Sequence, residues 1–337
     1  MRATPRFGLL AVGFLLFAAL AWVGWSAKTR SPENPAPETL RIAGPILPNT
    51  ALHLIADAQG FWALEGLSVQ LTPTDSGKAA MDLALVGAVD LAYAGDIPVT
   101  FAARDGKPMK IIASIARARN STEIVARRDR GIRTRSDLAG KRLGVTPGTA
   151  SDYFLWAMLV RDGINPATVT QVNVAPADMQ AQITAGYIDA AVTWHPNLFN
   201  IQAALGSNGL LISDPDIYVL NQFVIAAPDL LRMRPGALQK YLRALLRAET
   251  FAQTHPEAAL SIVAVRLGMS PSALRTIWMD AKLTVGLYQS QLITLEETAR
   301  WARQNQPQGP TTLPSMLEYF QLDSLAAVAP GRVTVIH

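Results

Sequence analysis

Histidines and hydroxyl residues are the side chains of this sequence that could perform chemistry. The chain has four histidines and no cysteine, which excludes disulfides, thiolate chemistry and cysteine-ligated metals. The histidines have no spacing typical of a metal site: His53, His195, His255 and His337. A serine nucleophile would need a Gly-x-Ser-x-Gly turn, and the sequence contains none. We therefore expect no catalytic group and no metal, and we interpret His195 as an imidazole in a pocket or on the surface.

The sequence instead predicts a site for an anion at a point where a strand leads through a turn into a capped helix. Residues 141–145 are predicted as a short buried strand, Pro147-Gly148 as a turn, and Thr149 with Asp152 as a capping box. A helix start presents free backbone N–H groups and the positive end of a dipole, and both favour an anion. The alternative is an ordinary capped helix that binds nothing. Similar corners recur along the chain, which favours the functional interpretation.

Composition indicates a globular chain behind a membrane-targeting segment. Half of the residues are hydrophobic, and the net charge of +4 is too small to indicate nucleic-acid binding. Arg2 and Arg6 precede an uncharged apolar run, residues 7–27, that is long enough to span a bilayer. Residues 1–27 are predicted as a signal peptide or an uncleaved anchor, and Trp25, close to the candidate cleavage position, favours the anchor. Residues 28–39 are predicted as a proline-rich tether.

From Leu40 onward the pattern alternates between short strands and helices. Strands are predicted at residues 40–43, 68–71, 90–94 and 111–115, with a loop and a helix after each of the first three. Such alternation predicts parallel sheets covered by helices. Residues 228–303 are predicted as mostly helical, with a looser stretch around 285–291.

These elements carry motifs that resemble a known family. The motifs include Asp57-Ala58-Gln59-Gly60-Phe61, Asp90-Leu91-Ala92, residues 136–145, Gly186-Tyr187-Ile188-Asp189-Ala190 and Trp194-His195-Pro196. In order and spacing they resemble the extracytoplasmic solute-binding proteins of nitrate, sulfonate, taurine and bicarbonate ABC importers, of NMT1/THI5-like type. The resemblance implies an α/β, two-lobed periplasmic-binding-protein-like fold (type II), with the ligand clamped between the lobes.

The same resemblance implies transport and not catalysis. The partners would be a small-molecule ligand and an ABC permease in the membrane, with no cofactor, no nucleic acid, a periplasmic location and a monomeric state. Two alternatives remain: a membrane-anchored sensor, or an enzyme of the pyrimidine-precursor or menaquinone type that uses this fold. The pyrimidine-precursor enzymes carry a cysteine-rich motif, which this chain lacks. The motifs do not distinguish nitrate, sulfonates, taurine and heterocyclic compounds as ligands.

The lobe boundaries are predicted from the point where a second run of alternating strands and helices begins. The arginine-rich stretch from Arg127 to Arg135 separates two series, so we expect the chain to cross to the second lobe there. Residues 221–226 are predicted as the returning strand. Lobe one would then comprise residues 40–125 and 220–337, and lobe two residues 126–219.

Candidate ligand-binding residues follow from the family's scheme, in which loops at the carboxyl ends of strands face the cleft. The matching positions are Asn49, Ser76, Gly77, Gly95, Asp96, Gly148, Thr149, Ser151, Trp194 and His195. Three of them, Ser76, Thr149 and Ser151, could equally be helix caps. The Trp194 ring could shield a solute or belong to the core.

The two lobes are expected to contact different ends of the ligand. The corner at residues 148–151 offers donors and no carboxylate, so it should hold an anionic end. Asp96 in lobe one either caps its helix or faces the cleft, where it would repel a bare anion and pair with a donor group. We therefore expect an organic solute with separate acceptor and donor ends, with Trp194 over its apolar middle.

Overall fold

The computed structural model describes residues 36–278, 281–305, 310 and 312–336. The predicted signal peptide or anchor and most of the tether lie outside these residues. Within the described part of the chain, no helix has the length and apolar character needed to cross a membrane. The chain from Glu38 onward forms one compact unit.

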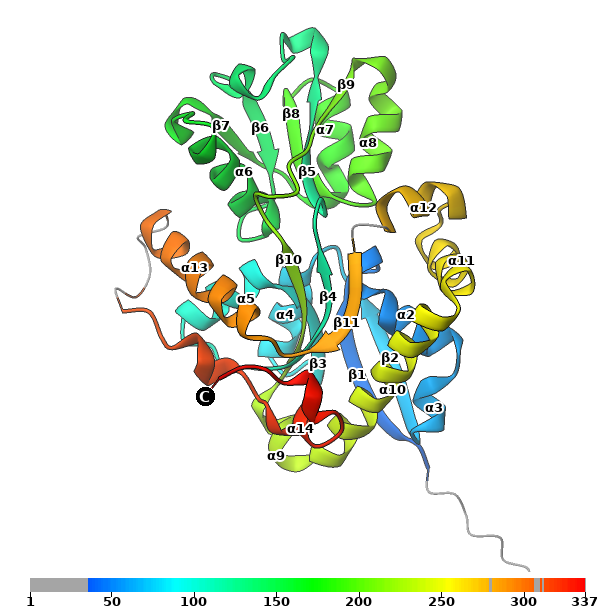
Figure 1. The fold of residues 1–337 in the computed structure, drawn as a ribbon. Helices are drawn as coiled ribbons and strands as arrows, with labels where there is room; N and C mark the ends of the chain where they lie inside the picture. Colours follow the sequence, from blue (N-terminus) through cyan, green and yellow to red (C-terminus); the bar gives the residue numbers. More distant parts are fainter. Residues whose placement is uncertain (1–35, 279–280, 306–309, 311, 337) are drawn as a thin grey trace, which may run out of the picture. The chain divides into compact units, whose positions relative to one another are not determined.

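The first sheet has six strands in the order β11-β4-β10-β3-β1-β2 (Figure 1). These are β1 (Glu38–Gly44), β2 (Leu67–Pro73), β3 (Leu91–Gly95), β4 (Lys110–Ala118), β10 (Leu220–Ala226) and β11 (Ala281–Gly286). β1 pairs in parallel with β2 and β3, whereas β10 runs antiparallel between β3 and β4, and β11 runs antiparallel to β4. The sheet is therefore mixed, which corrects the expectation of parallel sheets: among its described strands, only β1, β2 and β3 pair in parallel.

The second sheet has five strands in the order β7-β6-β8-β5-β9. These are β5 (Thr122–Arg127), β6 (Arg142–Val145), β7 (Thr170–Asn173), β8 (Ala190–Trp194) and β9 (Gly209–Ile212). β6 pairs in parallel with β7 and β8, whereas β5 is antiparallel to β8 and β9. β5 and β10, the strands that enter from the other sheet, are antiparallel to both of their neighbours, because a chain that crosses over arrives in the opposite direction.

Two crossings join the sheets, and Figure 1 shows them side by side between the upper and lower parts. The first runs from β4 into β5 through residues 119–121, and the second from β9 into β10 through residues 213–219. The predicted return strand is present as β10. The first crossing precedes the predicted boundary at residues 125 and 126, because β5 already belongs to the second sheet.

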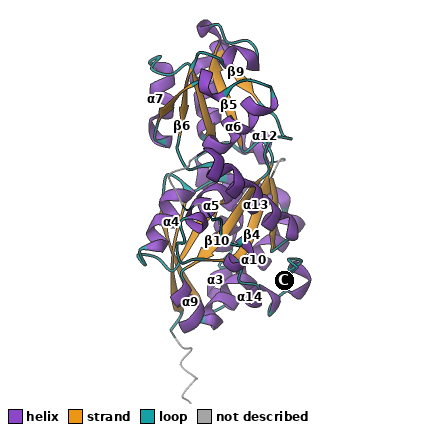
Figure 2. Ribbon diagram, turned by 90° about the vertical axis from the view of Figure 1, so that its left-hand side faces the viewer, coloured by secondary structure: helices purple, strands orange, loops and turns teal. Residues whose placement is uncertain are grey.

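Helices lie around both sheets (Figure 2). The α-helices are α2 (Ala51–Ala58), α3 (Phe61–Leu64), α4 (Gly77–Leu85), α5 (Asp96–Arg104), α6 (Ala150–Arg161), α7 (Met179–Thr184), α8 (Asn197–Leu205), α9 (Pro228–Met233), α10 (Pro235–Thr254), α11 (Pro256–Leu267), α12 (Pro271–Trp278), α13 (Gln289–Asn305) and α14 (Asp323–Ala326). Short 3₁₀ helices are η1 (Pro48–Thr50), η2 (Arg128–Arg130), η3 (Arg135–Leu138), η4 (Pro166–Thr168), η5 (Pro176–Asp178), η6 (Gly206–Asn208), η7 (Met316–Tyr319) and η8 (Pro330–Arg332). The mostly helical prediction for residues 228–303 missed β11, the edge strand of the first sheet.

Apolar spacing explains how the helices attach to the sheets. In α10 the residues at i, i+3, i+4 and i+7 are buried, namely Leu238, Tyr241, Leu242 and Leu245. This stripe packs into the core of the first sheet, where Trp62 of α3 stacks on Tyr241 with ring centroids 5.1 Å apart. The core of the second sheet includes Trp301 of α13, so a helix close to the C-terminus links both halves.

Candidate functional site

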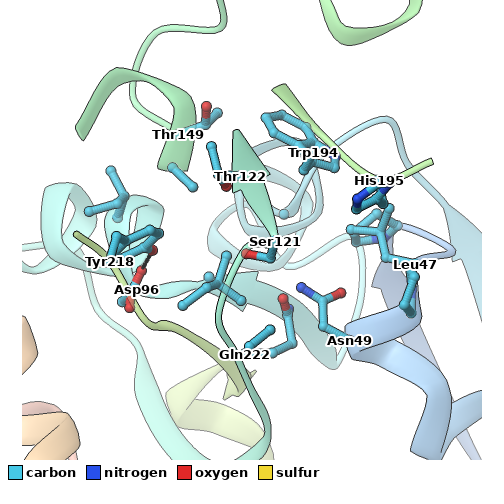
Figure 3. A pocket seen from close by; sticks show the side chains of 18 of the residues that line it. Leu47, Asn49, Asp96, Ser121, Thr122, Thr149, Trp194, His195, Tyr218 and Gln222 are labelled. Atoms are coloured by element: carbon cyan, nitrogen blue, oxygen red, sulfur yellow. Dashed lines mark hydrogen bonds between the residues drawn. The ribbon is translucent and has the colours of Figure 1, made fainter. Parts of the chain in front are cut away.

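A cavity of about 70 Å³ lies between the two sheets. Residues from both sheets and both crossings line it, and Figure 3 shows their side chains converging. The cavity brings together eight of the ten predicted residues: Asn49, Ser76, Gly77, Gly95, Asp96, Thr149, Trp194 and His195. Gly148 and Ser151 do not line it.

Helix starts form part of the cavity wall, because the carboxyl ends of strands lead into them. α4 follows β2, and its N-cap Ser76 accepts a hydrogen bond from the Ala79 amide at 3.2 Å. Gly77 is required here, since a Cβ atom would lie 2.9 Å from the Cα of Ala94. α6 follows β6 in the same way, with Thr149 as its N-cap. The positive ends of α4 and α6 therefore face the cavity, one from each half, and the start of α5 carries Asp96.

The α6 corner differs in detail from the predicted capping box. The Thr149 hydroxyl accepts from the Ser151 amide at 3.3 Å and donates to the Thr146 carbonyl at 2.6 Å. The Asp152 carboxylate accepts from the Gly148 amide at 3.2 Å, one residue before the N-cap. A capping box would need that carboxylate to accept from the N-cap amide itself. Thr149 is thus the N-cap, but Asp152 secures the turn in front of it.

Gly148 and Ser151 shape this corner from outside the cavity. Ser151 is fully buried, and its hydroxyl accepts from the Thr146 amide at 3.0 Å. Gly148 has a φ of +70°, which favours glycine, and a Cβ atom there would lie 3.9 Å from Lys78 and Phe101. Both of those residues belong to the first half, so Gly148 lies where the two halves meet.

Asp96 is fully buried at the first position of α5. One carboxylate oxygen accepts from the Tyr218 hydroxyl, and the other accepts from the backbone and side-chain amides of Asn221 at 3.1 and 3.2 Å. Burial raises the pKa of Asp96 to about 6, although these hydrogen bonds act in the opposite direction. Both oxygens are already used, so Asp96 joins α5 to the second crossing.

Four polar atoms of cavity residues are buried without a hydrogen-bond partner among the described residues. They are Asn49 Oδ1, Ser121 Oγ, Thr122 Oγ1 and Gln222 Nε2. A buried polar group left unpaired costs about 1–3 kcal/mol, so a ligand that pairs with these groups recovers free energy. Sequence reasoning missed three of them. Gln222 had a usable signal, because it and Asn221 are polar residues inside a strand, β10, whose other residues are apolar.

Trp194 and His195 lie at the end of β8, and Figure 3 shows both side chains on the same side of the cavity. Nε2 of His195 is 3.9 Å from a carboxylate oxygen of buried Glu123 on β5. Leu47 and Ile277 add apolar surface to the cavity wall. Among the described residues, no group of three or more His, Cys, Asp or Glu side chains could hold a metal ion.

Two α/β halves joined by two crossings, with a cavity at the crossings, define the periplasmic-binding-protein fold. The same fold is found in the alkanesulfonate-binding protein SsuA from Xanthomonas axonopodis pv. citri bound to MOPS, with a TM-score of 0.74, 18% identity, and coverage of 85% of this chain and 99% of that chain. The desulfurization enzyme DSZB also shares it, with a TM-score of 0.63, 20% identity, and coverage of 87% and 99%.

The chain belongs to the NMT1/THI5-like family, whose model matches residues 47–259. A putative binding protein of Brucella abortus (strain 2308) is 26% identical over 249 residues, which is 73% of this chain and 76% of that protein. The taurine-binding periplasmic protein of Escherichia coli (strain K12) is 29% identical over 163 residues, 48% of this chain and 49% of that protein.

Proposed function

We propose that this protein is the extracytoplasmic solute-binding component of an ABC importer and that it captures a small organic anion between its two lobes. The observation that carries the proposal is the cavity at the crossings, where two helix starts and four unpaired neutral polar groups converge. Backbone amides at helix starts favour an anion, and the amide and hydroxyl side chains can bind its remaining polar atoms.

Family membership supports the transport role. The relatives with assigned ligands are binding proteins for taurine and aliphatic sulfonates. Apolar wall residues such as Trp194, Leu47 and Ile277 favour a ligand with an organic part over bare nitrate, because nitrate has no apolar surface to bury.

Calorimetric titration with short sulfonates, short carboxylates and nitrate tests this proposal. Thr122→Val removes one unpaired hydroxyl from the cavity and should weaken binding about twofold to tenfold. Thr193→Val is the control, because Thr193 also has a buried, unpaired hydroxyl but does not line the cavity. Equal affinities of the two variants would contradict the proposed site, and binding of nitrate alone would contradict the organic ligand.

Binding without turnover is part of the proposal. The whole chain lacks cysteine, so thiol chemistry is unavailable. The fold alone does not decide this point, because DSZB is an enzyme with the same fold. A bound sulfonate should be recovered unchanged after long incubation, as measured by mass spectrometry, and a product would overturn this part.

The proposal also includes an N-terminal anchor, an ABC permease as partner and a monomeric state. The apolar run of residues 7–27 supports the anchor. Full-length protein should sediment with membranes at its full mass, and a soluble form beginning near Lys28 would show cleavage instead. A sensor role would be favoured if ligand uptake by cells did not depend on the protein.

A further inference from the structure

The charge distribution around the cavity bears on which anion fits. Among the described residues that line it, Asp96 carries the one carboxylate. Its oxygens accept from Tyr218 and from both amide groups of Asn221, and the side chain is fully buried. A ligand cation would have to displace these donors to reach it. Asp96 is thus a poor partner for an ammonium group, which disfavours the sequence-based alternative in which it pairs with a donor group of the ligand.

The other charges on the cavity wall are cationic. Lys78 pairs with Asp82 at 2.8 Å and Arg119 with Asp216 at 3.2 Å, and neither of these carboxylates lines the cavity. The starts of α4 and α6 add partial positive charge. Among the described residues, the cavity wall therefore offers a ligand ammonium two paired cations and two helix starts, and no carboxylate with a free accessible oxygen.

The groups left to bind the far end of a ligand are neutral. The side chains of Asn49, Thr122 and Gln222 are each more than nine-tenths buried, and each has an unpaired polar atom. Amide and hydroxyl groups can donate to or accept from a neutral polar group. They do not compensate the desolvation of an ammonium ion, which needs a charged partner when buried.

We infer that the site selects anions whose second polar group is uncharged, such as a hydroxyl or an amide, and rejects anions that carry an ammonium group. The inference rests on the proposed function and narrows its ligand class. It separates this chain from a taurine-binding relative, since taurine is a zwitterion with an ammonium group.

Calorimetric titration of the full chain with three two-carbon sulfonates tests the inference. Isethionate (2-hydroxyethanesulfonate) and taurine (2-aminoethanesulfonate) differ only in a hydroxyl against an ammonium, and ethanesulfonate lacks both. Isethionate should bind at least about tenfold more tightly than taurine, and ethanesulfonate should also bind more tightly than taurine. If taurine binds as tightly as isethionate, the inference is overturned while the proposed function stands. If no sulfonate binds, 3-hydroxypropanoate and β-alanine repeat the comparison on a carboxylate, and no binding there overturns both proposals.

A variant makes the test specific to the site. Asn49→Asp is nearly isosteric and places a carboxylate in the cavity wall, so the affinity ratio of isethionate to taurine should fall at least about tenfold. Thr193→Asn, a polar substitution away from the cavity, should leave the ratio unchanged. If the Asn49→Asp protein folds and its affinity ratio of isethionate to taurine is unchanged, the inference that this cavity selects the ligand is overturned. If the variant does not fold, the affinities of the wild type for isethionate and taurine decide the inference.

Discussion

Replacing Asp96 by asparagine should change how the free energy of unfolding depends on pH. Burial raises the pKa of Asp96 from 3.8 to about 6 in the folded protein. The folded state therefore holds this proton more tightly than the unfolded chain does. As the pH rises from about 4 to about 6, the wild type loses stability because the buried carboxyl must ionise. Asparagine carries no ionisable proton and removes this contribution.

The size of the effect follows from the pKa difference. A difference of about two pH units corresponds to about 3 kcal/mol, since each unit contributes about 1.4 kcal/mol. Because part of this total is already lost below pH 4, the unfolding free energy of Asp96→Asn minus that of the wild type should increase by about 2.4 kcal/mol between pH 4 and pH 8. Most of the increase should fall below pH 6, and the difference should be flat above it.

Urea unfolding of both proteins at one-unit intervals from pH 4 to pH 8 measures this difference. Tyr218→Phe is a useful companion, because it removes a donor that favours the charged carboxylate. Without this donor the pKa of Asp96 should be higher still, so the unfolding free energy of Tyr218→Phe should keep falling to a higher pH than that of the wild type. A difference that is independent of pH, or that shrinks as the pH rises, would refute the reasoning, since it would mean that the hydrogen bonds outweigh the burial.

Three further substitutions test the packing around the site. Gly77→Ala should lower the melting temperature and weaken ligand binding, because its Cβ would meet backbone of β3 at 2.9 Å; unchanged thermal unfolding would contradict this close approach. Trp301→Ala should lower the unfolding free energy by about 3–5 kcal/mol, because the Trp301 ring is buried and its centroid lies 5.1 Å from that of the Tyr153 ring. A loss below 1 kcal/mol in urea unfolding would contradict the role of α13 in linking the two halves. Gly144→Ala should cost about 1–3 kcal/mol in the same assay, because its Cβ would lie 2.5 Å from Ile188, and a neutral effect would show that the core can relax.

Sequence reasoning was effective where the information is local. The alternation of strands and helices from β1 to β4, the return strand β10 and the N-cap Thr149 all follow from patterns within about ten residues. The positions of Ser76, Gly95 and Trp194 at the cavity follow from one further rule, that the carboxyl ends of strands share an edge. Their role as ligand contacts remains a prediction.

Tertiary structure decided whatever depends on partners far apart in the chain. The sequence left Asp96 as either a helix cap or a carboxylate facing the cleft, and in the structure Tyr218 and Asn221, more than 120 residues away, use both of its oxygens. β11 was missed because it is a short edge strand whose pairing with β4 lies outside any local window. Thr122 and Gln222 reach the cavity because both lie where the chain crosses between sheets. A local sequence pattern determines where a strand or helix forms and which of its ends lies at the cavity. Whether a charged side chain in the cavity, such as Asp96, is available to a ligand depends on which residues from distant parts of the chain the fold brings next to it.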